Sequence, residues 1–277
     1  MIRLVIVSRL LRRRAGWYRD SRVAHIQIVP TLAAMAEIYR LPREGGAASP
    51  RFKRYLELIP RLHVLAAYNP MAGPHALETT EQLLAVDAEA VALEAASEAV
   101  DLCGHQDPIS LAVILCAPGA WTNRLTTEIQ HRTTQRPPSG HGLVLHWTRE
   151  APTAGQIRRE AMAETVRVMA GAAHGRRVSV ASVLHREGLA YALGGNPYGP
   201  VTAEDQCAVG DAVDVLGASE SIGDMMAVLY GDAAASALGW APAGVAEHGG
   251  YRWAIDQAER QVNDVGAPSA LSAIATS

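Results

Sequence analysis

The sequence has very little of the side-chain chemistry that most clearly marks an enzyme. Among its 277 residues the only lysine is Lys53. It lies in segment 50–54, between charged neighbours, which disfavours a Schiff-base lysine or a phosphate-binding lysine. The fingerprints GxGxxG, GxxxxGK[ST], HExxH and GxSxG are also missing. Classical dinucleotide binding, P-loop phosphoryl transfer and elbow-type serine hydrolysis therefore lose support, and no cofactor can be named.

Cysteine is scarce as well. Cys103, Cys116 and Cys207 are odd in number and far apart, so they match neither a disulfide framework nor a CxxC pair. Segment 1–14 has too short an apolar run for a secretory signal, and no stretch approaches the ~20 apolar residues of a membrane span. We therefore expect a cytoplasmic protein that does not bind membranes.

The overall composition is that of a folded protein with no strong charge. Hydrophobic residues make up 49% and charged residues 19%, and the formal net charge is -3. This balance gives no general attraction for nucleic acid or for an anionic membrane. The basic run 12–14 is interpreted as a solvated face. We expect a small molecule as the partner, and self-association through the helical half stays open.

In the first half of the chain, predicted strands alternate with predicted helices. Apolar runs predict strands at residues 23–29, 62–67, 111–116 and 143–147. The segments between them predict helices at 31–40, 51–59, 75–102 and 122–132. Such a series is typical of an α/β fold with a mostly parallel sheet of about four or five strands and flanking helices.

The second half predicts helices alone. They are expected at residues 154–173, 178–193, 203–216, 222–229, 233–238 and 250–265, and the small, polar tail 266–277 is expected to fray. We therefore divide the chain into an α/β sheet domain, 1–152, and an all-helical C-terminal region, 153–277. The pattern leaves open whether these helices pack on the sheet or form a second subdomain.

Unusual polar residues follow three of the predicted strands. Because ligands of open parallel sheets bind outside the carboxyl ends of the strands, we predict that these residues border one pocket. His75 is the predicted catalytic proton-transfer group, since a helix start keeps its imidazole neutral. The predicted substrate-binding residues are Asn69, Trp121, Thr122, Asn123, Arg124 and Arg149.

These substrate-binding residues fit an anion. Arg124 and Arg149 are planar, bidentate donors for a carboxylate or phosphate, and the asparagines orient the ligand. The resulting hypothesis is an enzyme of small-molecule metabolism, of hydrolase or lyase type, that acts on an anionic or carbonyl-bearing substrate by acid/base chemistry. A different interpretation is that the asparagines only cap turns and the arginines are solvated.

Two alternative functions remain. The first is a non-catalytic ligand-sensing or assembly protein that uses its helical half as an interface. The second is a metal-dependent hydrolase that uses Glu128 and His131, whose ExxH spacing places a carboxylate and an imidazole on one helical face. Because a catalytic metal usually needs three protein ligands, we predict that this pair holds no metal.

Overall fold

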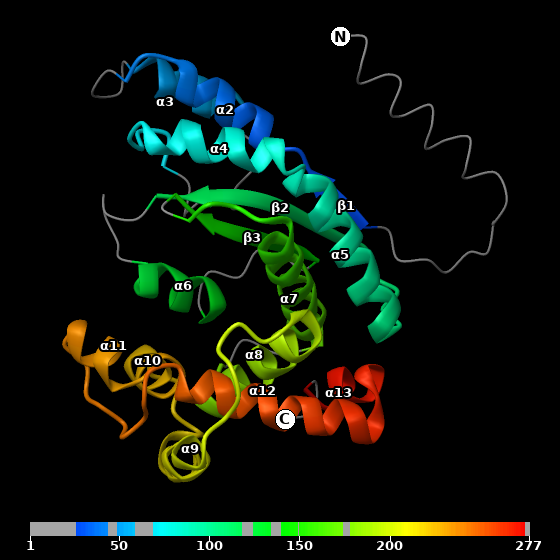
Figure 1. Ribbon diagram of the computed structural model, residues 1–277, viewed down its shortest axis with the longest axis vertical. Helices are drawn as coiled ribbons and strands as arrows, with labels where there is room; N and C mark the ends of the chain where they lie inside the picture. The colour runs from blue at the N-terminus through cyan, green and yellow to red at the C-terminus, as the bar shows by residue number, and fades with distance from the viewer. Residues whose placement is uncertain are drawn as a thin grey trace, which may run out of the picture.

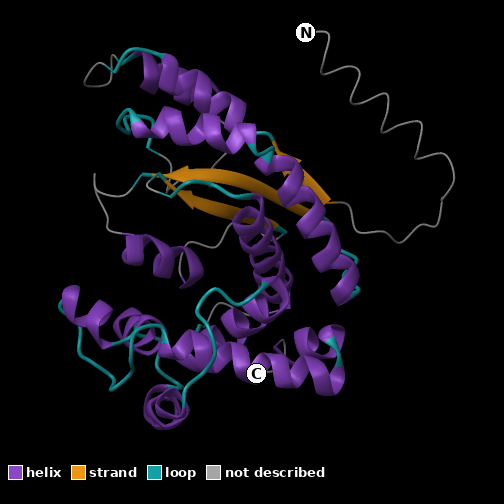
Figure 2. Ribbon diagram, viewed as in Figure 1, coloured by secondary structure: helices purple, strands orange, loops and turns teal. Residues whose placement is uncertain are grey.

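The structure, a computed structural model, describes residues 26–43, 49–58, 69–117, 124–133, 140–148, 150–173 and 178–274. Its described residues form a small parallel sheet with helices on both sides (Figures 1 and 2). This arrangement confirms a mixed α/β fold with a parallel sheet and flanking helices. None of the described helices is long and apolar enough to cross a membrane.

The sheet has three strands among the described residues, in the order β1-β2-β3, and not the four or five that we expected. They are β1 (Ile26–Val29), β2 (Ile109–Cys116) and β3 (His141–Trp147). Both pairings are parallel, with Ile28 opposite Leu111 and Leu111 opposite Gly142. The predicted strand 62–67 lies outside the described residues. The central strand β2 is buried along nearly its whole length, which explains its unbroken apolar sequence.

The helices of the first half are α2 (Leu32–Arg40), α3 (Pro50–Leu58), α4 (His75–Ala85), α5 (Ala88–Cys103) and α6 (Arg124–Thr133). Helices α2, α3 and α4 lie on one side of the sheet and α6 on the other (Figure 1). The single helix predicted over 75–102 is wrong. It breaks at Asp87, whose left-handed backbone (φ 51°) redirects the chain from α4, which packs on α2, into α5, which packs on β1.

Every regular element in the described part of the second half is a helix, as predicted. Its helices are α7 (Ala154–Ala173), α8 (Val180–Gly194), α9 (Ala203–Leu216), α10 (Ile222–Tyr230), α11 (Asp232–Ala237), α12 (Gly249–Val265) and α13 (Ala267–Ile274). Helix α13 corrects the prediction that the tail frays. Ala270 and Ile274 are fully buried in the core, so packing against the rest of the protein holds this segment in place. The small, polar composition of the segment gives no sign of this packing.

Two glycines allow the close contacts that position the functional residues. A Cβ atom on Gly142 of β3 would lie 2.9 Å from Glu164 of α7, so glycine lets the helix lie directly on the strand. A Cβ atom on Gly188 of α8 would lie 2.3 Å from the carbonyl oxygen of Ala254 in α12. Helix α7 thus joins the sheet to the helical half through β3, α5 and α8. The division at residues 152 and 153 stays a prediction.

Candidate functional site

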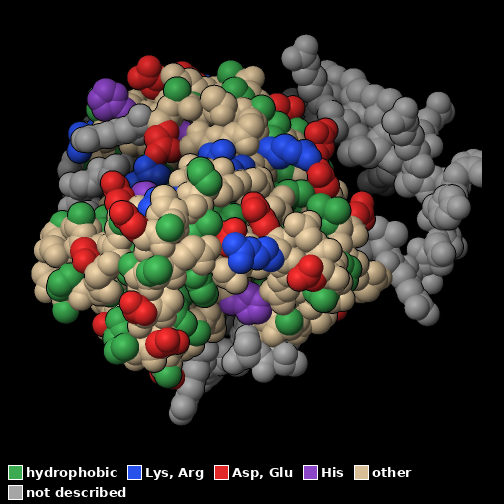
Figure 3. Space-filling view, turned by 60° about the horizontal axis from the view of Figure 1, so that its bottom comes forward, with side chains coloured by type: hydrophobic (Ala, Val, Ile, Leu, Met, Phe, Trp, Pro, Cys, Tyr) green, Lys and Arg blue, Asp and Glu red, His purple; other side chains and the backbone are tan. Residues whose placement is uncertain are grey.

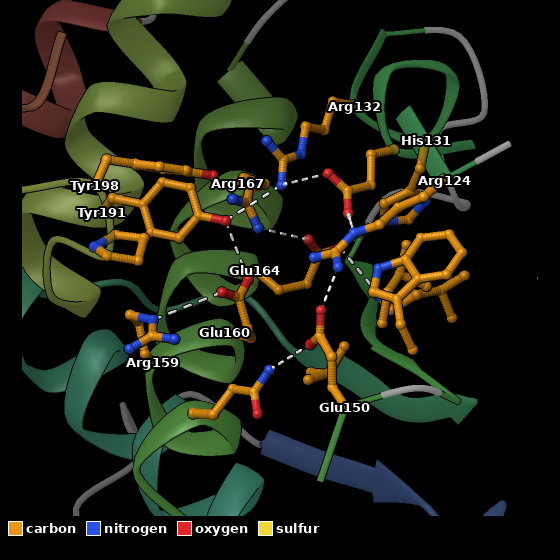
Figure 4. A pocket seen from close by; sticks show the side chains of 17 residues that line it. Arg124, His131, Arg132, Glu150, Arg159, Glu160, Glu164, Arg167, Tyr191 and Tyr198 are labelled. Atoms are coloured by element: carbon orange, nitrogen blue, oxygen red, sulfur yellow. Dashed lines mark hydrogen bonds and ion pairs between the residues drawn. The ribbon is translucent and has the colours of Figure 1, made fainter. Parts of the chain in front are cut away.

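A cavity of about 350 Å³ lies between the sheet and the helical half (Figure 4). Its walls come from α6, from β3 and the residues just after it, from α7, and from the end of α8 with the loop that follows. The lining residues are Arg124, Glu128, His131, Arg132, Leu143, Val144, Leu145, Trp147, Glu150, Gln156, Arg159, Glu160, Glu164, Arg167, Tyr191, Pro197 and Tyr198. Such a volume suits a small ligand.

Two helices place most of the charged side chains. Helix α6 contributes Arg124, Glu128, His131 and Arg132, and α7 contributes Gln156, Arg159, Glu160, Glu164 and Arg167. Residues three or four positions apart share one helical face, so each set forms a stripe. The opposite side of α7 carries Ala161, Met162 and Met169, which are buried in the core. The two polar stripes therefore face the cavity while the apolar faces hold the helices in place.

Arg124 stands at the end of the cavity near the carboxyl end of β3. Its Nε donates a hydrogen bond to Glu128 Oε1 at 2.7 Å, and its Nη1 donates to Glu150. Its guanidinium also lies over the Trp147 ring, 5.4 Å from the centroid. Gln156 Nε2 fixes the second oxygen of Glu150 at 2.7 Å. A residue from α6 is thereby tied to the segment that follows β3.

Glu164 forms the junction between β3, α6 and α7. Its Oε1 accepts a hydrogen bond from the Leu143 backbone N–H at 3.0 Å, and His131 Nε2 lies 3.4 Å from the same oxygen. Arg167 Nη1 donates to Oε2 at 3.3 Å. Burial alone raises the pKa of Glu164, but His131, Arg167 and the Leu143 N–H outweigh it, so the pKa falls below its usual value. The carboxylate stays charged.

Behind the cavity wall, Glu187 of α8 balances three arginines. Arg167 Nε donates to Glu187 Oε2 at 3.0 Å, while Arg132 and Arg186 lie 3.5 Å and 3.4 Å from its oxygens. Glu187 is completely buried. Burial alone would raise the pKa of Glu187. The three arginines outweigh burial and bring this pKa down to about 2. This one carboxylate therefore offsets a dense group of buried positive charge.

Tyrosines complete the wall on the side of α8. Tyr191 Oη donates to Glu160 Oε2 at 3.1 Å and accepts from Arg132 Nη2 at 3.2 Å. Tyr198 stacks on Tyr251 with ring centroids 4.5 Å apart. Burial raises the pKa of Tyr191, and nearby Glu160 reinforces the rise, so its phenol stays protonated near neutral pH.

The carboxylates of this wall are engaged with donors from the protein itself. The four lining carboxylates already accept bonds: Glu128 from Arg124 and Tyr230, Glu150 from Arg124 and Gln156, Glu160 from Tyr191, and Glu164 from Leu143 and Arg167. Three buried nitrogens, Arg132 Nη1, Arg159 Nε and Arg167 Nη2, have no hydrogen-bond acceptor among the described residues. They lie 3.5, 3.7 and 2.9 Å from glutamate oxygens, at ion-pair distance but without hydrogen-bond geometry.

Of the residues predicted from sequence, Arg124 lines this cavity. His75 and Asn69 do not line it. The His75 side chain is 82% exposed, with Glu78 3.9 Å away, and Asn69 Oδ1 accepts the Met71 N–H in a turn. The geometry therefore adds no support for His75 as the catalyst. Trp121, Thr122, Asn123 and Arg149 lie outside the described residues.

The ExxH pair does share a helix face, as predicted, but its members have different partners. Glu128 accepts bonds from Arg124 and Tyr230, whereas His131 meets Glu164. Among the residues that the structure describes, no group of three or more His, Cys, Asp or Glu side chains is arranged to hold a metal ion. The pair is thus part of the cavity wall, and the metal-dependent alternative has no described ligand set.

Sequence reasoning missed most of the cavity. Arg132, Arg159, Glu160, Glu164, Arg167 and Tyr191 line it and had no predicted role. The available signal was the spacing 156, 160, 164 and 167 on α7 opposite 124, 128, 131 and 132 on α6, two charged stripes on helices with apolar backs. Comparison with protein-family models, with curated proteins and with solved structures finds no match for this chain.

Proposed function

We propose that this chain is an enzyme of small-molecule metabolism that binds an anionic substrate in the cavity between α6, α7 and β3. The observation that carries the proposal is the four arginines in the cavity wall, Arg124, Arg132, Arg159 and Arg167, because a guanidinium is a planar, bidentate donor for a carboxylate or a phosphate. Hydrogen bonds from a guanidinium to a carboxylate or phosphate are roughly twice as strong as bonds between neutral groups, so an anion is the ligand class that this wall favours.

The remaining wall suits a metabolite-sized molecule. Leu143, Leu145 and Trp147 are alternate residues of β3, so they share one face of the strand, and all three line the cavity. Ligand sites commonly combine such an apolar surface with a few fixed polar groups. Carboxylates and an imidazole in the same wall supply groups for acid/base chemistry. We therefore retain the hydrolase or lyase type inferred from the sequence, and we propose the cavity, in place of His75, as the site of the acid/base chemistry.

Arg159 offers the sharpest test of anion binding. It lines the cavity and is 31% exposed, whereas its neighbour Arg158 is 46% exposed and pairs with Glu98 of α5 outside the cavity. We expect inorganic phosphate or a small carboxylate to raise the melting temperature, because a ligand at ~100 times its Kd adds about 2.7 kcal/mol. Arg159→Gln should weaken binding about tenfold or more, and Arg158→Gln by less than about twofold.

The matched pair separates a specific site from general charge effects, since both variants remove one positive charge from the same turn of α7. Equal weakening in both variants, or no anion that stabilises the wild-type chain, would refute the proposal. Each anion that binds is then incubated with the protein and followed by NMR for chemical change. Turnover supports the enzyme. Saturable binding without turnover supports the ligand-sensing alternative.

A further inference from the structure

His131 is the one imidazole among the residues that line the described cavity. Its side chain is 10% exposed, on the face of α6 that meets α7. Three other titratable groups of the wall are engaged in ways that oppose proton exchange. Glu128 and Glu150 are each held by Arg124 and by a second donor, and burial raises the pKa of Tyr191.

Glu164 determines which nitrogen of the His131 ring carries the proton. The carboxylate is held by donors from two elements, Leu143 of β3 and Arg167 of α7, so its position does not depend on the histidine. A carboxylate at 3.4 Å from Nε2 favours the tautomer in which Nε2 carries the proton. The lone pair is then on Nδ1, and the carboxylate stabilises the imidazolium that forms when Nδ1 takes a proton.

We propose that His131 is the proton-transfer residue of the cavity and that Glu164 is its positioning residue. The inference rests on the proposed function and narrows its substrate to an anion that gains or loses a proton during the reaction, as in elimination, hydration or hydrolysis. In the forward step Nδ1 takes a proton from the substrate or from the attacking water. The imidazolium, paired with Glu164, returns that proton to the product or leaving group, and the residue ends as it began.

The arrangement also explains why the arginines and the histidine share one wall. The guanidiniums hold the anionic group, and the substrate is thereby presented to an imidazole fixed on the neighbouring helix (Figure 4). A base fixed beside a bound substrate needs no further alignment for the proton transfer. Glu164 is the charged group in contact with the ring, and Arg124, Glu128 and Arg132 on α6 and Arg167 on α7 line the same cavity.

The test is NMR of the full-length protein labelled with ¹⁵N and ¹³C in histidine, with His131 assigned from His131→Gln. At constant pH and ionic strength, inorganic phosphate should shift the His131 ring signals with the same Kd as the thermal shift, while the signals of exposed His75 stay in place. In the wild type the ring ¹⁵N shifts should show the Nε2–H tautomer. Glu164→Gln should change the tautomer populations.

Each result decides between the proposals. Phosphate that binds without moving the His131 signals overturns the catalytic assignment and leaves anion binding intact. An Nδ1–H tautomer in the wild type, or unchanged tautomers in Glu164→Gln, overturns the positioning role. Phosphate that does not bind at all refutes the proposed function, and this inference with it. If Glu164→Gln does not fold, the wild-type titration and the wild-type tautomer still decide the assignment.

Discussion

Replacing Glu187 by glutamine tests how far the buried arginines depend on one carboxylate for their charge balance. Glutamine keeps the shape of the side chain and removes the charge. Arg132, Arg167 and Arg186 all lie within 3.5 Å of the Glu187 oxygens, and this carboxylate is completely buried. Removing one member of a buried ion pair typically costs about 3–5 kcal/mol, because the remaining charge is left without compensation.

The pKa of Glu187 gives a second estimate of the stability that Glu187→Gln should lose. Its fall from 4.5 to about 2 corresponds to about 3 kcal/mol of stability. Because the folded-state pKa is depressed, this contribution is complete above about pH 4.5 and is lost as the pH falls toward 2. By about pH 3.5 roughly 1 kcal/mol of it is gone. Glu187→Gln has no such contribution, so the gap between the two proteins should narrow in acid.

The assay is urea unfolding followed by circular dichroism at pH 7 and at pH 3.5. At pH 7 we expect Glu187→Gln to lose about 3 kcal/mol, or roughly 6–12 °C in melting temperature. The control is Glu98→Gln, since the Glu98–Arg158 pair is nearly half exposed and such pairs contribute less than about 1 kcal/mol. A loss of less than about 1 kcal/mol in Glu187→Gln, or a gap that widens at low pH, would refute the reasoning.

Two further predictions concern packing and thiol chemistry. Gly188→Ala should lower stability by about 1–3 kcal/mol in the same urea assay, because the new Cβ would lie 2.3 Å from the Ala254 carbonyl oxygen. Gly210→Ala, whose Cβ meets nothing within 4 Å in helix α9, should instead raise stability by up to about 1 kcal/mol, and equal effects would contradict the packing argument. A thiol reagent should titrate one cysteine in the native chain, the exposed Cys207, and all three in denaturant. Burial raises the pKa of Cys103 to about 11 and raises that of Cys116 as well, so rapid native reaction of a second thiol would contradict the structure.

The parallel sheet could be predicted from the sequence because the pattern that indicates each strand lies within a few neighbouring residues. An unbroken apolar run such as that of β2 is stable only where both faces are covered, and a helical pattern follows each strand. The same rule drew attention to Arg124, which follows β2 and does line the cavity. The break at Asp87 had no such signal, because the segment around it is rich in helix formers and the turn depends on what α4 and α5 pack against.

The cavity was hidden because its residues look like a solvated surface. Gln156, Glu160, Glu164 and Arg167 form the kind of charged stripe that usually faces water on an amphipathic helix. They are directed inward only because α6 and α8 lie opposite, and that placement depends on contacts between distant segments. The prediction of His75 rests on its position in the sequence alone. A helix start after a strand is a common place for a functional group, yet this side chain is 82% exposed.

The bond from the Leu143 N–H to Glu164 has a consequence for the outer margin of the sheet. Within the described residues β3 is an edge strand, and an edge strand offers unpaired main-chain groups to which a strand of another molecule can add. Here the Leu143 N–H is occupied by a side chain of α7, and Gly142 lets that helix lie flat against the strand. Strand addition at this point would have to pull Glu164 away from His131 and Arg167, so the carboxylate that holds the cavity wall together also occupies a main-chain donor of the strand edge.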